Sequence, residues 1–159
     1  MNPFSFILKF LPVVLLFFSA PAVCEVRENL TSGIDLSAGS PGPSFAGMLI
    51  GVNIKSEARL NFGYGYAPDW SIYQVGGKVF LSPSVITGYL GAGINYFSGN
   101  SLYKLVLWSM KFSSSFSPFI DGGIDYTADN GFHAFADISI CTSNTNILIW
   151  PAIGVGWYF

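Results

Sequence analysis

Apolar and polar residues alternate along most of the chain after residue 30. In the run 58–66, Leu60, Phe62, Tyr64 and Tyr66 alternate with Arg59, Asn61, Gly63 and Gly65. Successive side chains of a β-strand point to opposite faces, so a period of two predicts a strand with one apolar face. Because the pattern recurs in one run after another, we expect an all-β protein.

Nine such runs are separated by segments rich in glycine, proline, serine, asparagine and aspartate, which favour turns. The runs cover residues 31–39, 45–55, 58–67, 71–81, 85–97, 102–112, 118–127, 132–141 and 146–159. A tilted strand needs about ten residues to cross a membrane. The runs therefore suit membrane-spanning strands as well as the strands of a soluble sheet.

Composition separates these two classes. Of the 159 residues, 51% are hydrophobic, 17% are aromatic and only 10% are charged. A soluble sheet protein needs more charge on its outer face. After residue 24, no stretch reaches the roughly 18 consecutive apolar residues of a membrane-spanning helix. These observations predict an antiparallel up-and-down transmembrane β-barrel, with a soluble secreted β-barrel binding protein as an alternative.

Residues 1–24 have the order of a secretory signal peptide. One positive charge, Lys9, precedes an apolar run from Phe10 to Phe18, and small residues follow as far as Ala22. We expect export and cleavage near Ala22. Cys24 then either leaves with the signal peptide or stays on the mature chain, where it could carry a lipid.

The chain ends on alternating apolar residues that finish in an aromatic side chain: Ile153, Val155, Trp157 and Phe159. This ending resembles the C-terminal signature of bacterial outer-membrane proteins. The resemblance is to the class of small single-domain barrels, such as the OmpX-like proteins and the OmpA transmembrane domain, and it covers roughly residues 30–159. It implies a location in the cell outer membrane, recognition of these four residues by the barrel-assembly machinery, and a last strand that closes against the first.

Single-chain barrels of this class have an even number of strands, so nine runs point to eight strands or to ten. We expect eight, with residues 25–44 as a lead-in or first strand and with the barrel domain at 45–159. On this count, the segments 56–57, 82–84, 113–117 and 142–146 face the outside of the cell, and none of them is long.

The face opposite the apolar one carries nearly balanced charge. A buried charge needs a partner, so we expect these side chains to pair inside the closed barrel. They are Lys55, Arg59, Lys78, Lys111, Asp121, Asp125, His133 and Asp137. The interior of an eight-stranded barrel is just wide enough for its own side chains, which disfavours a wide pore. A ten-stranded barrel would leave room for small solutes.

A barrel with an apolar outer wall is sufficient for a structural or interaction role at the cell envelope. Its partner would be outer-membrane lipid or lipopolysaccharide. We expect a monomer of this kind without catalysis. The alternative is a lipid-modifying enzyme, because some small outer-membrane barrels are lipid A deacylases or acyltransferases. His133 would then be the base, Asp125 the orienting carboxylate and Ser109 the nucleophile. The deacylase pattern of a serine two residues after the histidine is absent, since Phe135 stands there.

Other partner classes find little support in the sequence. One histidine and two cysteines cannot form a metal cluster, so we expect no metal and no cofactor. The net charge of -2 is spread along the chain without a basic run, which argues against a nucleic-acid partner.

Overall fold

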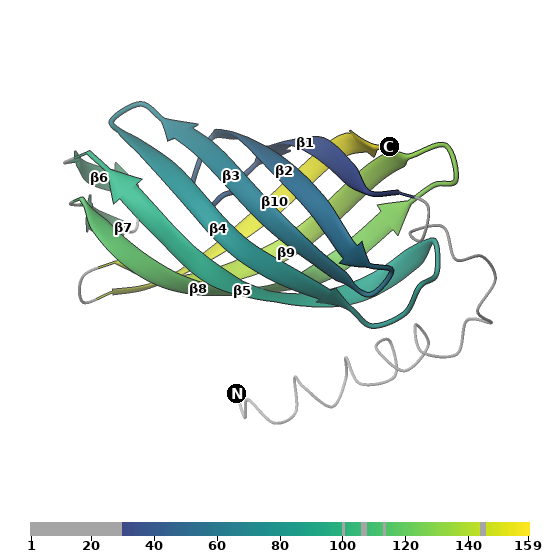
Figure 1. Cartoon of the computed structure of the whole chain (residues 1–159). Coiled ribbons are helices and arrows are strands. Elements are labelled where there is room, and N and C mark those ends of the chain that lie inside the picture. Colours follow the sequence, from purple (N-terminus) through teal and green to yellow (C-terminus); the bar gives the residue numbers. More distant parts are fainter. Residues whose placement is uncertain (1–29, 100, 106–107, 113, 144–145) are drawn as a thin grey trace, which may run out of the picture.

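Eight antiparallel strands form one closed barrel (Figure 1). The computed structural model describes residues 30–159 except 100, 106–107, 113 and 144–145, and it describes side chains outside 101–113 and 143–146. The barrel strands are β1 (Ser32–Ala38), β2 (Ala46–Lys55), β3 (Ala58–Ala67), β4 (Trp70–Phe80), β5 (Ile86–Ser98), β8 (Ser115–Thr127), β9 (Phe132–Ser143) and β10 (Asn146–Tyr158). The described residues include no helix that is long and apolar enough to span a membrane. The predicted eight-stranded antiparallel barrel is confirmed.

The structure shows the roles of two predicted runs that periodicity left open. The run 31–39 contains β1, which pairs with β10 on one side and with β2 on the other, so residues 25–44 include the first strand, one of the two expected alternatives, and the barrel begins at Ser32. The run 102–112 folds into β6 (Ser101–Leu105) and β7 (Trp108–Phe112), a two-stranded sheet separate from the barrel. Alternation does not distinguish a spanning strand from the two arms of a hairpin.

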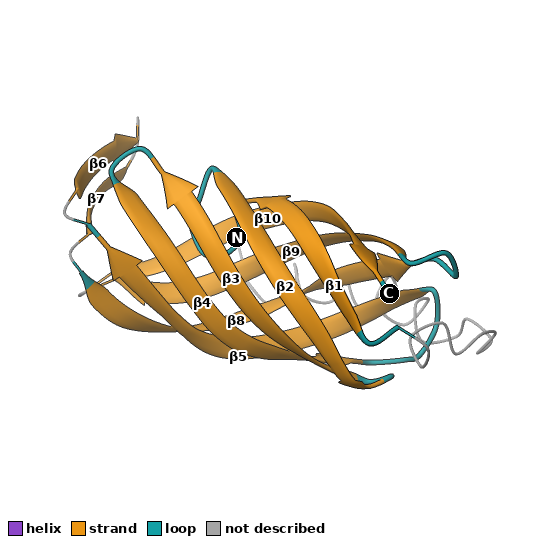
Figure 2. Cartoon of the chain, turned by 45° about the horizontal axis from the view of Figure 1, so that its top comes forward, coloured by secondary structure: helices purple, strands orange, loops and turns teal. Residues whose placement is uncertain are grey.

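Because 31–39 is a barrel strand and 102–112 is not, the connections lie at other ends of the barrel than predicted. The start of β1, the end of β10, the β2–β3 turn and the β4–β5 connection lie at one end of the barrel, whereas β6 and β7 lie at the other (Figures 1 and 2). The prediction that 56–57 and 82–84 share a side with 142–146 is therefore wrong. The four segments were also predicted to be short. This is wrong for the connection that contains residues 113–114, because β6 and β7 extend the connection between β5 and β8. We call these ends the Phe159 end and the hairpin end.

The outer wall of the barrel is apolar. Leu36, Leu90 and Ile153, on three different strands, are 63% to 64% exposed. Aromatic side chains contact one another in two rows, Tyr64, Tyr73, Tyr96 and Phe116 towards the hairpin end, and Tyr126, Phe132 and Trp157 at the Phe159 end. Aromatic girdles of this kind mark the two boundaries of a membrane around a barrel.

The lumen is filled differently at its two ends. Towards the hairpin end lies an apolar cluster of Ala67, Trp70, Ile72, Phe97, Phe119, Cys141 and Leu148. The β1–β2 connection, residues 39–44, is buried there and lies against Gly63, Gly65 and Ile72 of the barrel wall. Towards the Phe159 end the buried side chains include the charged ones, together with Phe80, Tyr89 and Tyr158. The charged part of the expected polar lumen therefore lies towards the Phe159 end, whereas inward positions near the hairpin end carry large apolar residues together with the uncharged Asn95 and Ser117.

Close packing across the lumen can be tested at two glycines. A Cβ on Gly93 would lie 2.5 Å from the Cα of Gly76 and 2.7 Å from Cε1 of Phe119, whereas the nearest atom to a Cβ on Gly77 would be 3.6 Å away. Gly93→Ala should lower the free energy of unfolding by about 1 to 3 kcal/mol through overpacking. Gly77→Ala should change it by less than about 0.5 kcal/mol. Urea unfolding in phospholipid vesicles measures both, and equal stability of the two variants would contradict this packing.

Candidate functional site: a charged network in the lumen

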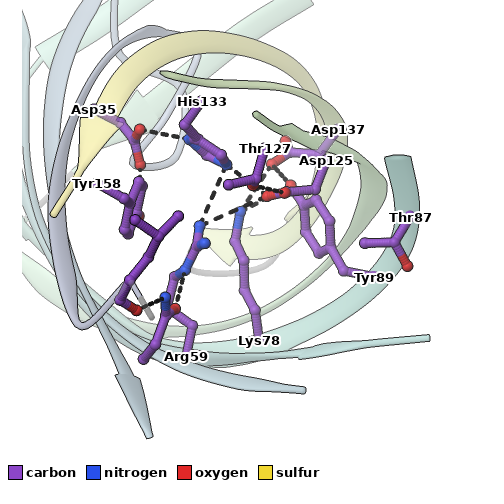
Figure 3. A network of polar contacts seen from close by, with 12 residues as sticks. Asp35, Arg59, Lys78, Thr87, Tyr89, Asp125, Thr127, His133, Asp137 and Tyr158 are labelled. Atoms are coloured by element: carbon purple, nitrogen blue, oxygen red, sulfur yellow. Dashed lines mark hydrogen bonds and ion pairs between the residues drawn. The ribbon is translucent and has the colours of Figure 1, made fainter. Parts of the chain in front are cut away.

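His133 of β9 lies at the centre of the buried polar side chains, and only 1% of its surface is exposed. Its Nδ1 is 2.6 Å from Oδ1 of Asp35 on β1, and its Nε2 is 2.6 Å from Oδ2 of Asp125 on β8 (Figure 3). An ionised carboxylate only accepts hydrogen bonds, so both ring nitrogens donate when both carboxylates are ionised. The imidazolium form of His133 then links the carboxylate of Asp35 on β1 to the carboxylate of Asp125 on β8.

Arg59 of β3 joins this group from the opposite wall. Its Nη1 is 3.6 Å from Oδ2 of Asp125, and its Nε donates to Oδ1 of Asn53 on β2 at 2.8 Å. The guanidinium carbon lies 4.0 Å from the ring centroid of Tyr158, within the range of a cation–π contact. The Tyr158 hydroxyl in turn donates to Oδ2 of Asp35 at 3.0 Å. The first and last strands are thereby connected through side chains as well as through the backbone.

Lys78, Tyr89 and Asp137 form a second group beside the first. Lys78 Nζ on β4 donates to the Tyr89 hydroxyl on β5 at 2.8 Å, and that hydroxyl donates to Oδ2 of Asp137 on β9 at 2.5 Å. Lys78 and Asp137 also form an ion pair of 3.7 Å. Together the two groups draw a side chain from every barrel strand. Charges buried together in this way compensate one another.

The structure brings six of the eight predicted lumen residues together in the interior: Arg59, Lys78, Asp121, Asp125, His133 and Asp137. Lys55 is exposed at the last position of β2, where the register with β3 shifts between Asn53 and Lys55, so the prediction that it faces the lumen is wrong. Lys111 lies on β7, outside the closed barrel, so its predicted lumen position is also wrong. The Lys111 side chain lies outside the described residues.

Four members of the network, Asp35, Asn53, Tyr89 and Tyr158, are not among the predicted lumen residues. Asp35 stands at a polar alternate position of the run 31–39, but its contacts with other strands cannot be predicted from that run alone. Tyr89 and Tyr158 carry hydroxyls at inward positions, where they meet Lys78 and Asp35. A tyrosine on the polar face of an alternating strand is the signal that would have identified them.

The residues proposed for catalysis do not assemble. His133 and Asp125 are in contact, but Ser109 lies on β7 in the separate sheet, and its side chain lies outside the described residues. The hydroxyl of Thr127 donates to Oδ1 of Asp125 at 2.9 Å. Ser139 stands six residues from His133 along β9, about 20 Å away. The described residues contain no group of three or more histidine, cysteine or acidic side chains suited to a metal ion.

The four residues of the expected assembly signal lie together on the outer face at the end of β10. Ile153, Val155, Trp157 and Phe159 are 44% to 67% exposed, and the residues between them face inward or are partly covered. The alternation read from the sequence thus corresponds to a continuous outward row.

Comparison with known proteins supports the fold. No family model matches the chain, and no curated protein matches its sequence. The chain is similar to the N-terminal β-barrel domain of Pseudomonas aeruginosa OprF, with a TM-score of 0.60 and 16% identity over 80% of this chain and 96% of that one. It is also similar to the designed barrel TMB2.3, with a TM-score of 0.56 and 13% identity over 82% and 94% of the two chains.

Yersinia pestis Ail, an outer-membrane protein, matches with a TM-score of 0.52 and 11% identity over 82% of this chain and all 100% of that one. At these identities the comparisons establish the fold alone. The protein has the fold of the small eight-stranded outer-membrane β-barrels, and the resemblance to that class is confirmed.

Lys78 and Lys55 give a matched test of the network. Lys78→Met keeps most of the side-chain length but leaves Asp137 without its ion-pair partner, so it should lower the free energy of unfolding by about 3 to 5 kcal/mol. Lys55→Met removes an exposed lysine and should change it by less than about 0.5 kcal/mol. Urea unfolding of the two variants in vesicles measures the difference. Similar stability of both would contradict a paired charge at Lys78.

Proposed function

We propose that this protein is an outer-membrane barrel with a structural or interaction role at the cell envelope and without an open pore. One observation carries the proposal: every barrel strand exposes large apolar side chains on the wall, while charged side chains are buried in the lumen. An exposed apolar surface of this extent would drive aggregation in water, whereas lipid solvates it. The natural surroundings of such a wall are therefore a bilayer.

The soluble secreted barrel requires the opposite distribution. A water-facing sheet places its apolar side chains inside and its charges outside. Here, Arg59, Lys78 and His133 are at most 7% exposed, whereas Phe116 is 77% exposed. This distribution of buried charges and exposed apolar side chains favours a membrane barrel over a soluble one.

The packing of the lumen supports the absence of a pore. The apolar cluster and the buried residues 39–44 fill the hairpin end, and the charged network fills the Phe159 end. Eight strands leave an interior that is just filled by side chains. A solute would have to displace both layers to cross.

The proposal includes export and assembly, which we infer from residues 1–24 and from the outward row that ends at Phe159. In this proposal residues 1–24 act as a signal peptide that is cleaved near Ala22, and the predicted signal peptide lies outside the described residues. The barrel-assembly machinery then recognises the outward row that ends at Phe159. The inserted barrel is a monomer whose partners are the surrounding lipid and lipopolysaccharide, since the pairing of β1 with β10 leaves no open edge in the wall.

A lipid-modifying enzyme is the less supported function. Its base would be His133, but that side chain is 1% exposed inside the lumen and both ring nitrogens already contact carboxylates. A lipid substrate on the outer wall cannot reach it without opening the barrel. The network is better explained as a means of holding the strands together.

The proposal is tested by fractionation followed by a permeability assay. After expression in a Gram-negative host, the protein should stay with the outer membrane through a carbonate wash, because its apolar wall is solvated by lipid. Proteoliposomes made from it should not swell in isotonic solutions of small sugars, whereas proteoliposomes with a general porin should. Recovery in the soluble periplasm would contradict the membrane location, and swelling at the porin rate would contradict the closed lumen.

A further inference from the structure

A small cavity lies where the charged and apolar parts of the lumen meet. Its volume is about 10 Å³. The polar side chains around it come from β3, β4 and β8 and from the buried β1–β2 connection: Asn61, Gln74, Lys78, Asp121 and Ser40. All of them are at most 8% exposed, so the cavity is surrounded by side chains that have lost contact with bulk water.

Asp121 has an unmet hydrogen-bonding need at this place. It is 8% exposed, and its Oδ1 has no hydrogen-bond partner among the described residues. Oδ1 of Asp137 likewise has no partner among the described residues, but Oδ2 of Asp137 and Oδ2 of Asp35 each accept a hydrogen bond from a neighbouring tyrosine. A buried acceptor without a donor costs about 1 to 3 kcal/mol, and more when it is charged, so a donor is expected beside Asp121.

The size and chemistry of the cavity identify its occupant. A space of about 10 to 15 Å³ holds one water molecule, provided that two to four polar groups surround it. Water can donate to the Asp121 carboxylate while it accepts from the amide of Asn61 or Gln74 or from the Lys78 ammonium. A cation would suit the carboxylate and the amide oxygens, but the positive charge of Lys78 borders the same space and opposes it.

We propose that one water molecule is bound in this cavity, where it donates to Oδ1 of Asp121 and is held by Asn61, Gln74 and Lys78. Lys78 already donates to the Tyr89 hydroxyl, so the water extends the charged network from Lys78 to Asp121. It also joins that network to the neutral amides of β3 and β4. This hydration site goes beyond the proposed envelope role and does not depend on it, because it rests only on side chains buried inside the barrel.

The test measures contacts between water and the side-chain amides by NMR in a micelle. The folded protein, labelled with 15N, should show cross-peaks from a long-lived water to the amide protons of Asn61 and Gln74. Asp121→Leu fills the space and removes the acceptor, so these cross-peaks should disappear. Asn95→Leu is the matched control: it replaces a buried amide of β5 outside the cavity, and the cross-peaks of Asn61 and Gln74 should remain.

The wild-type spectrum decides the proposal by itself, even when the Asp121→Leu variant fails to fold. Absence of water cross-peaks at both amides of the folded wild-type protein overturns it. A sodium ion in place of water would shift the amide signals of Asn61 and Gln74 when sodium is added to a sodium-free sample, and this result also overturns it. An Asp121→Asn variant, which keeps an acceptor oxygen, should retain the cross-peaks.

Discussion

The pairing of β1 with β10 is the constraint on which the rest of the structure depends. A wall that faces lipid cannot leave backbone N–H and C=O groups unpaired, because each unpaired group costs several kcal/mol. The seven residues of β1 contribute six register pairs with β10. Asp35 reinforces this seam, since it accepts hydrogen bonds from Tyr158 on β10 and His133 on β9. Closure therefore depends on backbone and side chains together.

Closure with eight strands also determines what the interior must contain. The lumen is narrow, so side chains from opposite walls meet, and charges there must be compensated by other charges. Arg59 reaches Asp125 across the barrel, and Lys78 reaches Asp137. Glycines provide the space: the Asp121 carboxylate lies where a side chain on Gly91 would otherwise stand. The same narrowness accounts for the absence of an open passage in the proposed function.

Alternation, together with the low charge and the C-terminal signature, was sufficient to predict the barrel, its antiparallel order and its apolar outer face. It was not sufficient to choose the eight strands, because 102–112 alternates as clearly as 31–39 does. The difference lies in pairing: β1 has partners on both sides, whereas β6 and β7 pair with each other. Pairing between strands far apart in sequence leaves no periodic trace in either strand.

The candidate site was predicted as a set of residues but not as an arrangement. The alternation of apolar and polar residues within each strand correctly indicated that Arg59 and His133 would face inward, since successive side chains point to opposite faces. Alternation failed to predict the position of Lys55, which is exposed together with Ile54 at the end of β2, where the register with β3 shifts. Which carboxylate meets which base depends on the shear of the closed barrel, and single-strand patterns contain no information about shear. The contact of His133 with Asp35, which lie 98 residues apart in the sequence, is the clearest case.

The closed membrane barrel is tested most directly by gel mobility of the protein extracted from the outer membrane in detergent, loaded once unboiled and once boiled. The two samples should migrate to different positions, since the closed barrel stays compact in detergent until heat separates β1 from β10. A single position for both samples, at the mobility of an unfolded chain, would contradict a stable closed barrel. It would equally contradict the inward and outward assignments that follow from closure.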